Sequence, residues 1–540
     1  MRRKIVRPFA VALLILVAAF VQRSRAESCP SPQHPSFKVA IAEGLAKNPV
    51  AGRLLVMMSN QDGPAEKLAP NYGPDAHSVW IAAKEISNLA PQNPVTLDPY
   101  DLAYPDLFCK APQGAYKIKV VLDVNHNFAY YYDSSDGDLI GTLAEQDFNP
   151  SSSDTISITL TERQTDPPLQ LPPNTELLDF VSPALSRFWG RPIHMRGAVV
   201  LPPSYKTGKG YYPTVYWNHG FGGDLRRVVG RYALNLSKDM ETKRSPEMIW
   251  ALLEQASPTG THEFADSVNN GPWGKALVRE LIPYLEKKYR MDARPSGRLL
   301  TGHSSGGWAS LWVQVSHPNV FGGTWPTAPD PGDFRNFTGP DLTKTPLPNF
   351  YRHDNGSPDM LIRMGGKDVQ SLQDLAMQER VLGDYSGQLA SFEWVFSPRG
   401  KDGRPMPLFN RDTGEIDPEV AAYWHEHYDI AYLLRTHWKE IGPQINGKIH
   451  LTVGTQDTFH LDEPARLLEQ TIKDLGGKAD FTYLEGRTHF DLYQGGLQQK
   501  IANEMYRVAR PQTRTKKRFS IKRDGRDQKA LLDSDRIHKP

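Results

Sequence analysis

The sequence predicts an α/β domain built on a mostly parallel sheet, with a smaller β-sandwich before it. Two observations lead to this fold class. Beyond about residue 180, strand and helix patterns alternate, which is typical of a parallel sheet covered by helices on both faces. Between residues 35 and 165, short alternating or β-branched runs are separated by Pro, Gly, Asn and Asp, without a long amphipathic helix. With 39% apolar residues among 540, the chain has material for both cores.

At the start of the chain, residues 1–26 have the layout of a secretory signal peptide. A basic start is followed by an apolar run at 9–21, and Ser24 and Ala26 place small side chains at positions −3 and −1. We expect cleavage after Ala26 and a secreted or periplasmic protein, with a retained membrane anchor as the alternative. No later apolar run approaches the ~20 residues that span a bilayer, so the mature chain is expected to have no integral span.

Four runs have the pattern of strands in the expected sandwich, at residues 37–41, 53–58, 116–122 and 155–160. Such strands close most naturally into two facing sheets. Proline pairs at 167–168 and 172–173 then predict a linker. Cys29 and Cys109 are the only cysteines, and in an oxidising compartment they either pair, tying the mature N-terminus to this domain, or stay apart.

The predicted α/β domain covers residues 180–505. Its strands are expected at 214–217, 298–301, 449–453 and 481–484, and apolar helical faces are expected at 277–285 and 308–315. Residues 331–447 form a long polar segment between two of these strands, rich in Pro, Gly and Asp. So long an interval is most simply an insertion, which we expect to act as a lid over the site.

The strongest functional signal is the run Gly302-His303-Ser304-Ser305-Gly306, between a predicted strand and a predicted helix. A serine on a tight strand-to-helix turn is held in a strained conformation with its oxygen exposed, and flanking glycines let the strand and helix approach. The N-terminus of the helix also stabilises negative charge that develops nearby. Ser304 is therefore the predicted nucleophile, and Ser305 is the competing choice.

A catalytic serine needs a base, and the base needs a carboxylate that orients it. Asp457 and His489 each follow a predicted strand, so both are expected at the carboxyl edge of the sheet. They also follow the serine in the order acid, then histidine, that accompanies a nucleophile of this kind. We therefore predict a triad of Ser304, Asp457 and His489, with Asp462 and Asp330 as alternative acids.

Residues 218–223 follow another predicted strand and contain three glycines, which suits a loop that supplies backbone donors to an oxyanion hole. We expect the N–H groups of Phe221 and Ser305 to be these donors. His219 is expected to be structural rather than catalytic, with a substrate contact as the alternative. Trp273 follows a loop-like sequence and is the tryptophan expected to line a substrate pocket, unless it belongs to the core like most others.

We expect neither a metal nor another cofactor. Asp123, Asn125 and Asn127 offer oxygen ligands at alternate spacing, but the glycine and final glutamate of an EF-hand loop are missing, so a polar hairpin is preferred to a calcium site. His425 and His427 are two residues apart and would point apart on a helix, which disfavours zinc.

Charge is distributed unevenly along the chain. The formal net charge is only +2, which excludes a general nucleic-acid binder. Residues 510–540 nevertheless carry eleven Lys/Arg against four Asp. We expect this basic segment to be a solvated, disordered tail, with docking to an anionic surface as the alternative. Without the signal peptide and the tail, the folded body is acidic.

Residues 180–505 resemble the esterase-D-like branch of the α/β-hydrolases, which includes enterochelin esterases and feruloyl esterases. The resemblance is carried by residues 219–223, 276–283, 302–307 and 454–457 and by the loop of His489. It implies a carboxylic-ester hydrolase that forms a covalent acyl-enzyme on Ser304 without a cofactor and acts on a small or glycan-linked ester. An N-terminal β-sandwich also fits secreted members of this group. The insertion at 331–447 and the basic tail depart from the family, so no particular substrate carries over.

Two other functions stay open at this stage. A secreted serine peptidase or amidase would use the same triad. A non-catalytic envelope- or glycan-binding protein would use the β-sandwich, although a scaffold has no need of an intact Ser304, Asp457 and His489.

Overall fold

The computed structural model describes residues 34–511, so the predicted signal peptide at 1–26, Cys29 and almost all of the basic segment 510–540 lie outside the described residues. The pairing of Cys29 with Cys109 and the character of the tail therefore stay predictions. In the described part of the chain, no helix has both the length and the apolar character that crossing a bilayer requires.

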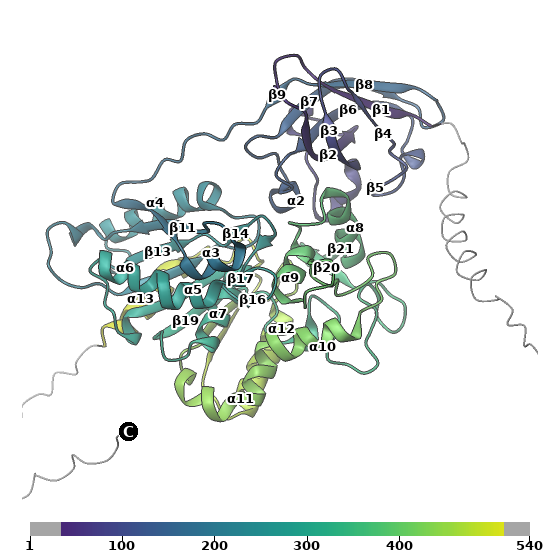
Figure 1. Ribbon diagram of the computed structural model, residues 1–540. Helices are drawn as coiled ribbons and strands as arrows, with labels where there is room; N and C mark the ends of the chain where they lie inside the picture. The colour runs from purple at the N-terminus through teal and green to yellow at the C-terminus, as the bar shows by residue number, and fades with distance from the viewer. Residues whose placement is uncertain (1–33, 512–540) are drawn as a thin grey trace, which may run out of the picture.

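An eight-stranded sheet lies at the centre of residues 175–509, in the order β10-β11-β13-β12-β18-β19-β22-β23 (Figure 1). In chain order the strands are β10 (Thr175–Val181), β11 (His194–Val200), β12 (Thr214–Asn218), β13 (Ile249–Leu253), β18 (Arg298–His303), β19 (Gly323–Thr327), β22 (His450–Gly454) and β23 (Asp480–Leu484). All neighbours from β13 to β23 are parallel, whereas β11 is antiparallel to both of its neighbours. The predicted α/β class with a mostly parallel sheet is confirmed.

Helices cover both faces of this sheet. Strands β12, β13 and β19 are buried at every residue. Because successive side chains of a strand point to opposite faces, complete burial requires cover on both sides. The covering helices include α4 (Gly230–Glu241), α6 (Ile282–Lys288), α7 (Ser305–Ser316), α12 (Asp462–Asp474) and α13 (Leu497–Ala509). Helix α7 is itself buried along almost its whole length.

The N-terminal region consists of two sheets that share one core. The larger has the order β5-β3-β2-β6-β7-β9 and the smaller β4-β1-β8. Their strands are β1 (Ser36–Ile41), β2 (Val50–Ser59), β3 (Trp80–Leu89), β4 (Val95–Leu97), β5 (Ala103–Tyr104), β6 (Gly114–Asp123), β7 (Leu139–Phe148), β8 (Thr155–Leu160) and β9 (Glu162–Arg163). Phe37 and Val39 of the smaller sheet lie in one buried cluster with Val56 and Val120 of the larger, as in a sandwich.

The outer face of the larger sheet is buried as well. Leu55 of β2 lies in a cluster with Val381 and Leu382 of helix α8 (Leu372–Leu382), which belongs to the 331–447 segment. Figure 1 shows α8 directly beneath the sandwich, beside the short helix α2 (Phe128–Tyr131). Residues 54–58 of β2 are therefore all apolar, without alternation, because both faces of the strand are covered.

The segment at 331–447 separates β19 from β22, as predicted, but it is a packed layer. It contains a hairpin and helices, namely β20 (Met360–Met364), β21 (Lys367–Ser371), α8, α9 (Gln388–Phe396), α10 (Pro418–Tyr428) and α11 (Ile430–Ile445). The ring of Phe396 lies 4.9 Å from Trp308 of α7 and 5.2 Å from Trp424, between centroids. The segment therefore has an apolar side that packs on α7, in spite of its polar composition.

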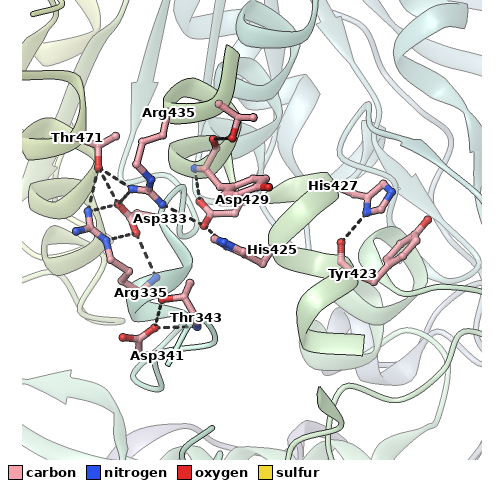
Figure 2. Close-up of polar contacts among 12 residues, drawn as sticks. Asp333, Arg335, Asp341, Thr343, Tyr423, His425, His427, Asp429, Arg435 and Thr471 are labelled. Carbon is pink, nitrogen blue, oxygen red and sulfur yellow. Dashed lines mark hydrogen bonds and ion pairs between the residues drawn. The ribbon is translucent and has the colours of Figure 1, made fainter. Parts of the chain in front are cut away.

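A cluster of charged side chains within this segment contacts Thr471 of α12 (Figure 2). Asp333 accepts hydrogen bonds from Arg335, 2.6 Å from Nη2, and from the hydroxyl of Thr471 on α12, 3.3 Å away. Arg435 of α11 lies 3.8 Å from the carboxylate of Asp333 and 3.9 Å from that of Asp429. Both carboxylates are wholly buried, and the arginines that compensate their charge belong to the same segment. Arg335 and Arg435 also donate to the hydroxyl of Thr471, at 2.9 and 3.1 Å, so the cluster bonds to α12 through an uncharged side chain.

The two histidines weighed as metal ligands have separate partners (Figure 2). His425 Nδ1 lies 2.8 Å from the carboxylate of Asp429, and His427 Nδ1 donates to the carbonyl of Tyr423 at 2.8 Å. The two rings therefore make separate contacts on α10, as their spacing of two residues predicts.

One buried arginine connects the sandwich to α8. Arg53 of β2 is 3% exposed. Its guanidinium donates to the carbonyl oxygens of Val381 (2.9 Å) and Arg380 (2.8 Å) and pairs with Glu85 at 2.7 Å. These carbonyls lie at the C-terminal end of α8, where a helix leaves its acceptors without internal partners.

We predict that Arg53→Met lowers the free energy of unfolding by about 1–3 kcal/mol, because it leaves buried carbonyl acceptors unpaired. Thermal and denaturant unfolding of the full chain measure the change. Arg196→Met is the matched control, since Arg196 is 55% exposed and its 3.7 Å ion pair with Asp179 lies at the surface. Equal stability of the two variants would contradict the role assigned to Arg53.

Candidate active site

Ser304 occupies the turn between β18 and α7 in a strained conformation. Its φ of 58° and ψ of −128° lie in a region that side chains other than glycine rarely adopt. The turn is possible because a Cβ on Gly302 would lie 2.1 Å from the carbonyl oxygen of Gly306, and one on Gly306 would lie 2.3 Å from that of Asn218. The run 302–306 therefore has the glycines that its geometry requires, and Ser304 stays partly exposed at the carboxyl edge of the sheet.

His489 and Asp457 are brought together from the loops that follow β23 and β22. The Nδ1 atom of His489 lies 2.9 Å from a carboxylate oxygen of Asp457, and the two side chains are 4% and 0% exposed. The other carboxylate oxygen accepts the backbone N–H groups of Phe459 (2.9 Å) and Leu461 (3.3 Å). Burial alone would raise the pKa of Asp457, but the charge and hydrogen bond of His489 and these N–H groups outweigh it, so the pKa lies below its usual value.

The histidine also lies against the nucleophile turn. The ring of His303, the residue before Ser304, is 4.4 Å from that of His489 between centroids, and Phe459 packs edge-on to His489 at 4.9 Å. The three predicted triad residues thus lie in one cluster at the carboxyl edge of the sheet. An imidazole whose Nδ1 is held by a carboxylate, next to the turn of a serine, is the arrangement in which histidine acts as a general base.

The β20–β21 hairpin holds the loop of Asp457 from outside. Arg363 of β20 donates to the carbonyl oxygen of Asp457 at 3.0 Å and to the carboxylate of Asp462 at 3.0 Å. Its backbone N–H also donates to the carbonyl of Thr458 at 2.8 Å. Asp462, an alternative acid in the sequence analysis, is therefore engaged by Arg363, whereas Asp457 is the acid bonded to His489.

The glycine-rich loop at 219–223 lies against Ser304. A Cβ placed on Gly220 would be 3.1 Å from the Cβ of Ser304 and 3.7 Å from its hydroxyl oxygen. This close approach brings the backbone of the loop to the position where an oxyanion would form. Ser305 is the first residue of α7, so its N–H is one of those that a helix N-terminus leaves free.

Two residues predicted to contact substrate occupy other places. His219 is 1% exposed, and its ring nitrogens are occupied by the carbonyl of Gly220 (2.8 Å) and the N–H of Gln255 (3.0 Å). Burial lowers the pKa of His219 to about 4, so the ring is neutral and supports the loop. Trp273 is 7% exposed and stacks on His262 at 3.6 Å, so it belongs to the core. The structure thus favours the structural role expected for His219 and the core alternative for Trp273, and a substrate contact by either residue stays a prediction.

A further carboxylate lies beside the nucleophile. Asp330, which follows β19, accepts a hydrogen bond from the hydroxyl of Ser305 at 2.6 Å and is 6% exposed. This bond and complete burial make Ser305 a poor competitor to Ser304 as nucleophile. Burial raises the pKa of Asp330 to about 6, with Asp457 acting in the same direction and the bond to Ser305 and the charge of His489 acting against it. Sequence position marked Asp330 only as an alternative acid.

Comparison with known proteins gives a family match and several structural likenesses. A family model described as "Putative esterase" matches residues 191–500. The "Uncharacterized protein YbbA" of Bacillus subtilis (strain 168) is 25% identical over 138 residues, which are 24% of this chain and 53% of that protein. The chain thus spans about half the length of the curated relative that it matches.

Among solved structures, a ferulic acid esterase is 14% identical, with a TM-score of 0.39 over 62% of this chain and 98% of that one. The fluorophosphonate-binding serine hydrolase FphF of Staphylococcus aureus is 14% identical, with a TM-score of 0.36 over the same shares of the two chains. An S-formylglutathione hydrolase from Agrobacterium tumefaciens is 13% identical, with a TM-score of 0.35 over 62% and 94% of the two chains.

We predict that Asp330→Asn changes stability in a pH-dependent way. The folded chain holds a proton on Asp330 up to a pH of about 6, whereas the unfolded chain releases it near its usual value of 3.8. Stability of the wild type relative to Asp330→Asn should therefore fall as pH rises from 4 to 7 and then level off. Asparagine still accepts the hydrogen bond of Ser305.

Denaturant unfolding at pH 4.5, 6 and 8 measures this difference, with Asp147→Asn as an exposed control. A difference between wild type and Asp330→Asn that stays constant over this range would contradict the raised pKa.

Proposed function

The chain belongs to the esterase family whose model it matches over residues 191–500, and on this basis we propose that it is a serine carboxylic-ester hydrolase with Ser304 as nucleophile. The observation that carries the proposal is the strained serine at the β18–α7 turn beside a buried histidine–carboxylate pair. Ester hydrolysis through an acyl-enzyme needs a serine, a histidine and a carboxylate together, and these three groups lie at the carboxyl edge of the sheet.

In the proposed mechanism, His489 Nε2 removes the proton of the Ser304 hydroxyl as its oxygen attacks the ester carbonyl. Asp457 accepts from Nδ1, keeps the imidazole in the required tautomer and stabilises the imidazolium. The tetrahedral oxyanion accepts hydrogen bonds from the N–H groups of Ser305 and Phe221. The alcohol leaves with the proton that His489 carries, and a water activated by the same ring then releases the acid from the acyl-enzyme.

The proposal extends to the organisation and location of the chain. Residues 35–165 are assigned to a β-sandwich domain and 180–505 to the catalytic domain, with 331–447 as its insertion. The signal-peptide pattern at 1–26 supports a secreted or periplasmic enzyme, which would meet small or glycan-linked esters outside the cytoplasm. The triad and the oxyanion donors need no cofactor.

The first test is active-site labelling. We predict that a fluorophosphonate probe labels the purified chain at Ser304, because it reacts as an ester does but leaves a stable adduct. The wild type should hydrolyse short-chain p-nitrophenyl esters, and Ser304→Ala should keep its fold and lose both reactions. Turnover of a matched amide at a rate comparable with that of the ester would favour a peptidase, because an ester is intrinsically the more reactive substrate. A folded wild type that neither labels nor turns over would favour a binding protein.

The second test concerns the acid. Asp457→Asn should lower kcat by about 10³–10⁴-fold, since asparagine favours the wrong tautomer of His489. Asp462→Asn is the matched control, because Asp462 lies five residues later, at the start of α12, and pairs with Arg363. If Asp462→Asn caused the larger loss, the acid of the triad would be misassigned.

A further inference from the structure

The N-terminal sandwich contacts the oxyanion loop directly through one tyrosine. Tyr130 of α2 is 2% exposed, and its hydroxyl donates to the carbonyl oxygen of Gly223 at 2.7 Å. Its ring packs edge-on against Phe221, with centroids 4.7 Å apart. Both contacts fall on the loop whose backbone lies against Ser304, although Tyr130 and this loop are about ninety residues apart in the chain.

The loop leaves little room for another arrangement. Gly222 has a φ of +74°, and a Cβ there would lie 3.3 Å from the backbone oxygen of Tyr130. On the catalytic-domain side, His219 donates to the carbonyl of Gly220. The loop at 220–223 is therefore held between His219, which belongs to its own domain, and Tyr130, which does not.

Tyr130 is itself held rigidly. The carboxylate of Asp123 accepts the N–H groups of Asn127 (3.2 Å) and Phe128 (2.9 Å), which fixes the start of α2 at the end of β6. Next to Tyr130, the ring of Tyr131 lies 4.0 Å beneath the guanidinium of Arg227, just beyond the loop. Burial raises the pKa of Tyr130 well above its usual value, so the phenol stays a donor throughout the working range of a hydrolase.

We propose that Tyr130 is a positioning residue for the oxyanion hole, so that the N-terminal sandwich forms part of the catalytic unit. This inference rests on the proposed function. An oxyanion donor works only when its N–H lies about 2.7–3.1 Å from the developing charge. The ring of Tyr130 fixes the side chain of Phe221, and its hydroxyl fixes Gly223 two residues later, so Tyr130 holds the loop on the C-terminal side of the Phe221 N–H. His219 holds the other side, because the Gly220 carbonyl to which it donates belongs to the same peptide unit as this N–H.

The test is Tyr130→Phe in the full chain, which removes the hydroxyl and keeps the ring. We expect kcat for p-nitrophenyl esters to fall about 10-fold, less than the 10²–10³ that follows loss of a whole donor, with KM changed less than twofold. The rate constant for fluorophosphonate inactivation should fall by the same factor. A boronic acid, which mimics the tetrahedral intermediate, should bind more weakly by that factor, whereas the product acid should bind equally well.

Tyr116→Phe is the matched control, because Tyr116 is 3% exposed in the same sandwich and its hydroxyl also donates to a backbone carbonyl, that of Pro112, at 2.7 Å. It should leave kcat, KM and inactivation unchanged. Tyr130→Leu, which also removes the ring from Phe221, should lose more activity than Tyr130→Phe. Unfolding midpoints of all variants are measured alongside.

The outcomes separate this inference from the function on which it rests. If the wild type neither hydrolyses esters nor labels, the proposed function fails. If the wild type is active and Tyr130→Phe matches it, the function stands and the positioning role is wrong. A fall in kcat accompanied by an equal rise in KM and a lower unfolding midpoint would indicate a structural contact and would also overturn the inference.

Discussion

The backbone of Ser304 is the constraint on which the rest of the site depends. Its positive φ is tolerated because β18, α7 and the loop after β12 approach within distances that only glycine permits at residues 302 and 306. Such a conformation persists only where its surroundings determine it completely. The buried helix α7 and the fully buried neighbouring strands provide those surroundings, so the apolar core of the α/β domain also supports the strained turn of Ser304.

The parts added to this core act on the same site from two directions. The hairpin β20–β21 holds the loop of Asp457 through Arg363, and the sandwich reaches the loop at 220–223 through Tyr130. The added parts are also joined to each other, since Arg53 of the sandwich caps α8 of the insertion. The expected role of the insertion as a lid stays a prediction, and its ring contact with α7 shows that it packs directly on the α/β domain.

Burial has opposite consequences for the two carboxylates beside the nucleophile. The carboxylate of Asp457 accepts hydrogen bonds from His489 and from two backbone N–H groups, so its charge is compensated and its pKa is lowered. Asp330 has the hydroxyl of Ser305 as its hydrogen-bond donor, so desolvation prevails and its pKa is raised. In the sequence the two acids look alike, because each follows a core strand. In the structure Asp457 ionises more readily, whereas Asp330 holds its proton to higher pH.

Local order in the sequence was enough to determine the α/β class, the serine turn and the identity of Asp457 and His489 as partners, because strand ends, glycines and chain order are local signals. It left two alternatives open for His219 and Trp273, whose rings are buried in the structure, since burial depends on what the rest of the chain places over them. Tyr130 and Arg363 carried no signal at all. Only tertiary structure brings a sandwich tyrosine and an insertion arginine to catalytic loops about ninety residues away, because the contacts that do so are hydrogen bonds to backbone carbonyls, which any sequence offers.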